Sequence, residues 1–298
     1  MSVLADKNTR VVCQGITGTQ ATFHIQRSID YGTKVVSGVT PGKGGTTHLG
    51  LPVFNTVMEA KKETGANTSV MYVPAPHVKS AVREAVEAEL DLAVCIADNV
   101  PIQDMLEIRA ILKGTKTRFI GPNTPGIITP GEARLGIFPE NIHKKGKIGI
   151  ISRSSTLTYE AVIETNRVCL GQSTVVGLGD DIIIGMDFVE ALELFHKDEE
   201  TEAVIMLGRL GGTFEEDGAR FYKSLQNKKP VIGFVAGDAL PYGHKMGYAG
   251  DIITKGRISA QDKKDVMADS GIIVVNNINH IHHELKKILQ CDDTACAL

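Results

Sequence analysis

The chain of 298 residues is long enough for two domains of ordinary size, and 42% of its residues are hydrophobic, so it can bury a substantial core. Its net charge is −3 and its 32 lysines and arginines are scattered, which excludes nucleic acid or a membrane surface as the main partner. No stretch reaches the roughly 18 consecutive apolar residues that a bilayer span requires. We expect a cytoplasmic protein, or one of the mitochondrial matrix or a related organelle if a transit peptide has been removed.

In the first half of the chain, short β-branched runs alternate with amphipathic stretches. Such alternation is typical of βαβ units, which form a parallel sheet buried on both faces. The expected helices are ATFHIQRSIDYG, PHVKSAVREAVEAEL and IQDMLEIRAILKG. The expected strands are TRVVCQG, KVVSGV, SVMYVP, LAVCIA and RFIGP.

The stretch from 122 to 146 interrupts this pattern, because it holds four prolines and four glycines and has no helical period. A second series of five strands and intervening helices follows, which favours a flavodoxin-like doubly wound domain. We therefore assign 1–123 to a Rossmann-like domain, 124–145 to a connector and 146–298 to the flavodoxin-like domain. The expected strands of the second series are KIGIIS, STVVGLG, AVIMLG, KPVIGFVAG and GIIVVNN.

Two glycine-rich loops follow the first two strands. GITGTQATFH (15–24) joins a strand to a helix, where backbone N–H groups can approach a phosphate. TPGKGGTTHLG (40–50) ends the second strand and contains Lys43, which can hold a second phosphate. Each loop alone is compatible with a tight turn or a surface loop; together they predict a cofactor that carries several phosphates.

A third junction of this kind, SRSSTLTYEA (152–161), opens a helix in the second half. Its hydroxyl-rich turn suits either an anion site or an ordinary helix cap. The sequence HIHH (280–283) lies on the last amphipathic stretch with no other metal-ligand residue nearby, so we expect a surface helix and no metal. The five cysteines contain no CxxC pair and no disulfide-like spacing, which predicts reduced thiols.

In order and spacing, several motifs resemble the α-subunit of succinyl-CoA synthetase, the ADP- or GDP-forming succinate–CoA ligase. The resemblance runs from about residue 2 to about residue 290. The motifs are GITGTQATFH, VTPGKGGTTHLGLPVFNTV, YVPAPHV, GPNTPGIITPGEARLGI, SRSSTLTYEA and MGYAGDII.

The resemblance implies a ligase of the tricarboxylic acid cycle that binds coenzyme A in its N-terminal domain. It also implies a β-subunit partner that supplies the site for ATP or GTP with Mg²⁺, and a small carboxylic acid as substrate. Tyr159 matches the residue that contacts the acid, and Ser154 and Ser155 match the phosphate loop. Carried over by position, the coenzyme A contacts are Thr17, Gly18, Thr19, Gln20, Lys43, Ile96, Ala97 and Asp98.

The sequence departs from the family where phosphate is transferred. The family phosphorylates a histidine that is Tyr248 here, and the glutamate that orients this histidine is Arg209. Tyrosine is protonated at neutral pH, and its phosphate ester is a poor donor to a carboxylate, so we expect Tyr248 not to be phosphorylated. A glycine of the phosphate loop is Ser155. Asp180 and Asp251 add negative charge that we expect to oppose a docked phosphate.

Three functions remain open at this point. The chain can be a working ligase α-subunit with chemistry adapted around Tyr248. It can be an inactive or repurposed CoA-binding paralogue that regulates a β-like subunit. It can also catalyse another reaction of CoA esters without phosphate. His244, four residues before Tyr248, is a candidate replacement nucleophile or an ordinary loop histidine.

Overall fold

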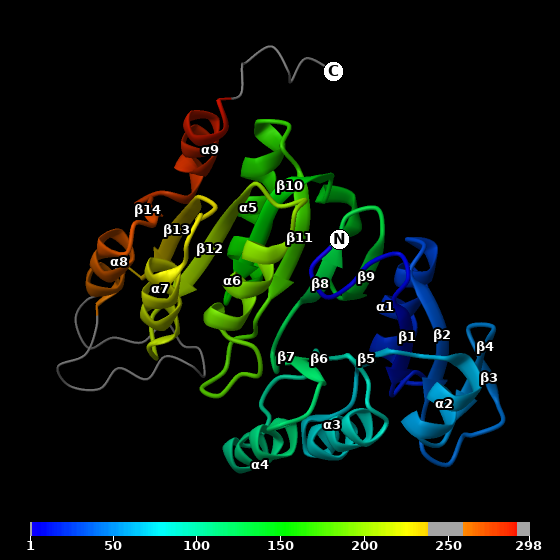
Figure 1. The fold of residues 1–298 in the computed structure, drawn as a ribbon. Coiled ribbons are helices and arrows are strands. Elements are labelled where there is room, and N and C mark those ends of the chain that lie inside the picture. Colours follow the sequence, from blue (N-terminus) through cyan, green and yellow to red (C-terminus); the bar gives the residue numbers. More distant parts are fainter. Residues whose placement is uncertain (1, 238–258, 291–298) are drawn as a thin grey trace. The chain divides into compact units, whose positions relative to one another are not determined.

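The computed structural model describes residues 2–237 and 259–290, and the chain divides into two compact units. One unit comprises 4–138 together with 183–186, and the other comprises 1–3, 139–182 and 187–298. No helix among the described residues is long and apolar enough to cross a membrane. The two units are the Rossmann-like and the flavodoxin-like unit, and both have mainly parallel sheets, as predicted (Figure 1).

The Rossmann-like unit has the strand order β3-β4-β2-β1-β5-β6-β7. All neighbours in it are parallel except β3 and β4, so β4-β2-β1-β5-β6-β7 reproduces the classical dinucleotide-binding order. The strands of this sheet are β1 (Arg10–Gln14), β2 (Lys34–Val39), β3 (Thr47–His48), β4 (Leu51–Phe54), β5 (Thr68–Met71), β6 (Leu92–Cys95) and β7 (Arg118–Ile120).

The helices of this unit lie on both faces of the sheet, because right-handed crossovers reverse direction at β1. The helix α1 therefore covers one face and α2, α3 and α4 cover the other, where α3 and α4 lie side by side (Figure 1). The helices are α1 (Thr19–Asp30), α2 (Val57–Thr64), α3 (Val78–Glu87) and α4 (Ile102–Leu112), with a short 3₁₀ turn η1 (Ala75–His77) before α3.

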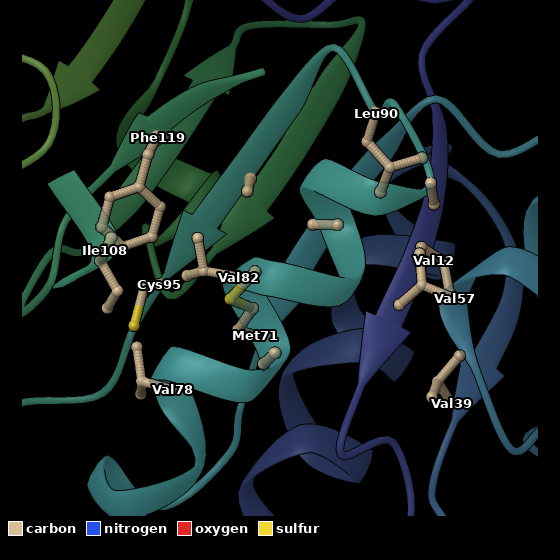
Figure 2. Close-up of a cluster of buried hydrophobic side chains, with 14 of the residues drawn as sticks. Val12, Val39, Val57, Met71, Val78, Val82, Leu90, Cys95, Ile108 and Phe119 are labelled. Atoms are coloured by element: carbon tan, nitrogen blue, oxygen red, sulfur yellow. The ribbon is translucent and has the colours of Figure 1, made fainter. Parts of the chain in front are cut away.

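The core of the Rossmann-like unit lies between the sheet and α2–α4. Figure 2 shows Val78 and Val82 of α3 beside Met71 of β5 and Cys95 of β6, and all four side chains are buried. The apolar residues of α3 recur at helical spacing, so one face of the helix packs on the sheet while its polar face meets solvent. This packing fixes the strand ends from which the candidate site is built.

The stretch that we predicted to be a connector, 124–145, contains a β-hairpin. Its strands are β8 (Gly126–Thr129) and β9 (Ala133–Gly136), and a 3₁₀ turn η2 (Glu140–Ile142) follows. Arg134 of β9 is buried and donates to the carbonyl oxygens of Phe138 and His24. The exact domain boundaries stay a prediction.

In the flavodoxin-like unit, five strands have the order β14-β13-β12-β10-β11 with parallel pairing. This is the flavodoxin order 2-1-3-4-5 read from the other edge. The strands are β10 (Lys145–Ser152), β11 (Gln172–Gly177), β12 (Ala203–Arg209), β13 (Val231–Ala236) and β14 (Ile273–Val274). The helices are α5 (Ser155–Arg167), α6 (Phe188–Lys197), α7 (Phe214–Ser224), α8 (Ala260–Asp269) and α9 (Ile281–Leu289), with the 3₁₀ turn η3 (Ile278–His280) before α9.

The helices α6, α7 and α8 pack in sequence on one face of this sheet, and α5 and α9 pack together on the other (Figure 1). The crossover direction changes between β10 and β12, so a crevice opens at their carboxyl ends. The HIHH segment spans the end of η3 and the start of α9, where His282 Nδ1 lies 2.5 Å from Glu164 of α5.

The cysteine prediction is confirmed for two of the three described cysteines. Cys13 and Cys95 are free, buried thiols. Cys169 is disulfide-bonded, so the prediction that all cysteines are reduced is wrong at this position. The absence of a CxxC motif did not indicate it, because a disulfide depends on the distance between two cysteines in the fold rather than in the sequence.

Candidate functional site

The turn from β1 to α1 is shaped to bring backbone N–H groups to a ligand. Gly15 has φ +83°, and a Cβ there would lie 2.8 Å from the carbonyl oxygen of Tyr72, so a side chain is excluded. Gly18 is the N-cap of α1 and gives no side-chain cap, and the first turn holds no acidic residue. An anion at this helix N-terminus therefore meets the positive end of the helix dipole without repulsion.

The second glycine-rich loop joins this turn through Lys43. Its Nζ donates to Thr17 Oγ1 at 3.1 Å, so the two loops that the sequence indicated meet in the fold. Asn55, at the end of the next strand, accepts hydrogen bonds from the backbone N–H groups of Gly42 (2.9 Å) and Gly44 (3.0 Å). We missed Asn55 in the sequence; its position, just before the cap of α2, is the signal that could have identified it.

The third predicted group, Ile96, Ala97 and Asp98, follows β6 at the same edge of the sheet. Ile96 N donates to Met71 O at 3.2 Å, which keeps the chain beside β5, and Asp98 is exposed. Because β5 lies between β1 and β6, this loop is about 10 Å from the end of β1. The structure thus gathers all three groups of predicted CoA contacts along one sheet edge.

Two hollows flank the β1–α1 turn. One, of about 350 Å³, lies at the ends of β1, β2 and β5 against α3 and has a mostly apolar lining. The other, of about 610 Å³, runs along the exposed side of α1. No sequence motif indicates either hollow. Residues of the first hollow are Gln14, Gly15, Val39, Pro41, Val73, Pro74, His77, Ser80, Ala81 and Glu84, and those of the second are Thr17, Thr19, Thr22, Phe23, Gln26, Arg27 and Leu49.

In the flavodoxin-like unit, the predicted phosphate loop forms the start of α5. Ser154 is the N-cap, and its side chain accepts a hydrogen bond from Leu157 N at 3.4 Å. Ser155 is the first residue of the helix, and its first turn holds no acidic residue. Tyr159 lies one turn further along and is partly buried. The loop therefore forms the ordinary helix cap, one of the two alternatives, and an anion site at the same helix start stays a prediction.

Arg209 and Asp180, two of the departures from the family, form an ion pair with each other. The Arg209 side chain is 3% exposed and the Asp180 side chain 10% exposed. The expectation that the negative charge of Asp180 opposes a docked phosphate is thus wrong, because the Arg209 guanidinium neutralises that charge. Together the two side chains carry no net charge.

A second set of buried charges lies beside Arg209. Arg153 Nη1 and Lys263 Nζ bind the two oxygens of Glu215, at 3.0 and 2.7 Å, and Lys263 also binds Glu216 at 2.8 Å. Burial alone would raise the pKa of Glu215, but the adjacent Arg153 and Lys263 charges hold it below its usual value. The set contains two cations and two anions, so it is neutral overall.

The remaining predicted residues of the transfer site are Tyr248, His244 and Asp251, and all three lie outside the described residues. Within the ranges that the structure describes, no group of three or more histidine, cysteine, aspartate or glutamate side chains could hold a metal ion.

The fold, with the loops after β1, β2 and β6 gathered at one sheet edge, is that of a CoA ligase. Residues 6–99 match the CoA binding domain family, and residues 151–273 match the CoA-ligase family. The chain belongs, more narrowly, to the succinate–CoA ligase α-subunit family. It is 51% identical to the ADP-forming succinate–CoA ligase subunit alpha of Staphylococcus epidermidis over 272 residues, which are 91% of this chain and 90% of the relative. The Staphylococcus aureus subunit is 50% identical with the same coverage.

Solved structures of other CoA-linked enzymes share the fold. An ATP citrate lyase mutant from Methanosaeta concilii, in complex with (3S)-citryl-CoA, superposes with a TM-score of 0.88 at 23% identity. A dinucleotide-forming acetyl-coenzyme A synthetase from Ca. Korarchaeum cryptofilum gives 0.73 at 19% identity. The match to the citrate lyase includes 99% of this chain and 52% of the lyase chain. The match to the synthetase includes 95% of this chain and 61% of the synthetase chain. This chain therefore spans only part of either protein.

Proposed function

We propose that this chain is the α-subunit of a ligase that joins a small carboxylic acid to CoA, coupled to conversion of ATP or GTP into its diphosphate and phosphate. The names of the curated relatives support the ligase and give no support to the inactive paralogue. The observation that carries the proposal is the meeting of the two phosphate-type loops at Thr17 and Lys43. The bacterial origin of the relatives supports a cytoplasmic location.

The residues of the Rossmann-like edge fit CoA. The exposed backbone of Gly18, Thr19 and Gln20 at the start of α1 suits the pyrophosphate, and the Lys43 ammonium suits a further phosphate. The apolar hollow of about 350 Å³ suits the adenine ring. The loop 96–98 then takes the arm that carries the thiol, and the thiol is the group that CoA supplies to the reaction.

The start of α5 fits the carboxylate side of the reaction. Ser155 offers its N–H, and Ser154 and Ser155 offer their hydroxyls, at the positive end of the helix dipole, whereas the Ser154 N–H already donates to Ser152 Oγ at 3.0 Å. Tyr159 lies one turn away to contact the acid. A β-subunit would supply the nucleotide with Mg²⁺, as the family implies. The neutral Arg209–Asp180 pair adds no negative charge to oppose the substrate anion.

Calorimetric titration of CoA into the full chain tests the cofactor site. Loss of one charge-assisted hydrogen bond costs about 1.5–3 kcal/mol, or about 10- to 150-fold in Kd, and charge reversal in Lys43→Glu should cost at least that. Lys34→Glu is the matched control, because Lys34 is exposed at the opposite end of β2. Equal affinity of wild type and Lys43→Glu would refute the site.

The transfer step requires a separate test, because Tyr248 stands where the family has its histidine. We propose that Tyr248 is not phosphorylated and that no phosphohistidine forms on this chain. The chain with its β-subunit should be incubated with radiolabelled ATP, and both acid-labile phosphate on histidine and acid-stable phosphate on tyrosine should be mapped by mass spectrometry. Acid-labile phosphate on His244 would contradict this proposal and identify a relocated nucleophile.

A further inference from the structure

The Arg209–Asp180 pair lies across the end of the central strand of the flavodoxin-like sheet. Ser152, the last residue of β10, is level with Gly177 of β11 on one side and Leu207 of β12 on the other. Asp180 follows β11 by three residues, and Arg209 ends β12. The two side chains therefore meet over the point where β10 leads into α5.

The distance between the strands explains why a long side chain is needed. Neighbouring strands are about 4.8 Å apart, so β11 and β12 are about 10 Å apart with β10 between them. An arginine can reach most of this distance, and its planar guanidinium binds a carboxylate in a fixed orientation. The pair thus acts as a strut between the loop after β11 and the loop after β12.

A hydrogen bond to Glu215 also holds the Arg209 end of the strut in place. The backbone N–H of Arg209 donates to Glu215 Oε1 at 3.1 Å, and the same oxygen binds Arg153 Nη1 at 3.0 Å. Arg153 lies directly between Ser152 and Ser154, so the turn into α5 and the start of the strut share one buried carboxylate. The strut crosses the sheet next to the crevice between β10 and β12, where the crossover direction changes.

We propose that Asp180 and Arg209 are positioning residues that hold the two loops on either side of the α5 N-terminus and so orient Ser154 and Ser155 toward the reacting oxyanion. This proposal rests on the proposed ligase function. The oxyanion is a substrate carboxylate or a phosphate, since both present the same oxygen geometry to a helix N-terminus. A displacement of about 1 Å in such a site can cost about 100-fold in rate, so loss of the strut should be measurable.

The first experiment measures steady-state kinetics of the reconstituted α- and β-subunits. Asp180→Asn and Arg209→Gln should each raise the KM for succinate or for phosphate about tenfold or more, while the KM for CoA, which binds in the other unit, stays unchanged. The substrate whose KM rises identifies the oxyanion. An unchanged KM for both oxyanions, or an equal rise for CoA, overturns the proposal.

Two controls separate the strut from a simple change of charge. Asp181→Asn removes a neighbouring negative charge, but the asparagine oxygen can still accept the hydrogen bond from Ile182 N (2.7 Å), so the KM values should not change. The exchange of both charges, Asp180→Arg with Arg209→Asp, keeps a strut and should recover most of the affinity lost in the single variants. A double variant as impaired as the single variants would contradict the role of the pair as a strut.

A binding measurement distinguishes failure of the strut from failure of the ligase. If the wild-type complex forms no acyl-CoA, the proposed function fails. Inorganic phosphate and succinate are then titrated into the full chain by calorimetry. Weaker binding in Asp180→Asn than in wild type and Asp181→Asn supports the strut. Equal binding in the wild type and both variants, or no binding of either anion to the wild type, overturns it.

Discussion

Lys263 is the residue whose removal should show most directly that buried charges hold the flavodoxin-like unit together. It lies on α8 with no exposed surface, and its Nζ contacts the carbonyl oxygen of Gly212 and the carboxylates of Glu215 and Glu216 at 2.7–2.8 Å. In Lys263→Met the side chain keeps similar bulk but loses the charge. Glu215 would then keep its contact with Arg153, whereas Glu216 would lose its contact with the lysine.

The magnitude follows from the contacts. Each hydrogen bond to a charged group contributes about 1.5–3 kcal/mol to stability. Lys263 makes two of them to carboxylates, so Lys263→Met should lower the free energy of unfolding by about 3–6 kcal/mol. Breaking a buried ion pair by removing one partner costs about 3–5 kcal/mol in general, which agrees. For a domain of this size, the unfolding midpoint falls by about 2–4 °C for each kcal/mol of lost stability. A loss of about 3–5 kcal/mol should therefore lower the midpoint by about 6–20 °C.

Differential scanning calorimetry of the full chain measures this shift. The matched control is Lys197→Met, which breaks a 2.6 Å pair with Glu193 on α6 whose two side chains are 66% and 49% exposed. Exposed pairs of this type contribute about 0.3–0.5 kcal/mol, so the control should move the midpoint by no more than about 2 °C. Equal shifts in the two variants would refute the argument that burial makes the Lys263 contacts strong.

Two further predictions concern the Rossmann-like unit. Burial raises the pKa of the Cys95 thiol from 9.0 to about 12, so at pH 8 only about one thiol in 10⁴ is ionised. Because the thiolate is the reactive form, Ellman's reagent should label Cys95 only after denaturation. Rapid labelling of the folded chain would contradict this. Since the raised pKa favours the neutral thiol in the folded state, its contribution to stability is complete below pH 9 and is lost as the pH rises towards 12. Gly15→Ala should cost about 1–2 kcal/mol from its positive φ, with a further cost from the close contact with Tyr72, and should weaken CoA binding in the same calorimetric titration; unchanged affinity would show that the turn is not part of the site.

The sequence predicted the features that depend on local pattern. Continuous β-branched runs separated by amphipathic stretches indicated both parallel sheets. The glycines after the first two strands marked the sheet edge where we propose that CoA binds. The contact between Lys43 and Thr17 was also within reach, because parallel strands end at a common edge. These signals need no knowledge of side-chain positions.

The features that the sequence did not predict depend on how side chains meet. Asp180 and Arg209 are 29 residues apart, and only the register of β10, β11 and β12 brings them together, so each appeared to be a separate defect. The hairpin β8–β9 appeared to be a connector because of its glycines and prolines. Yet Gly126 and Gly136 lie opposite each other at positive φ, so these glycines permit the pairing rather than prevent it.

The short segment Ile183–Met186 has a consequence for how the chain can be divided. Although it follows β11 in the sequence, it belongs to the Rossmann-like unit, where Met186 N bonds to Phe119 O at 2.7 Å and Gly185 N to Gly121 O at 2.8 Å. Arg109 of α4 also donates to the carbonyl oxygen of Ile184 at 3.1 Å. An expression fragment that ends near residue 138 would therefore lack the partners of these groups. During synthesis, the first unit cannot be completed until residue 186 has been made. By then the residues of β10, α5 and β11 have already been synthesised. The segments of the two units consequently alternate along the chain rather than following one another.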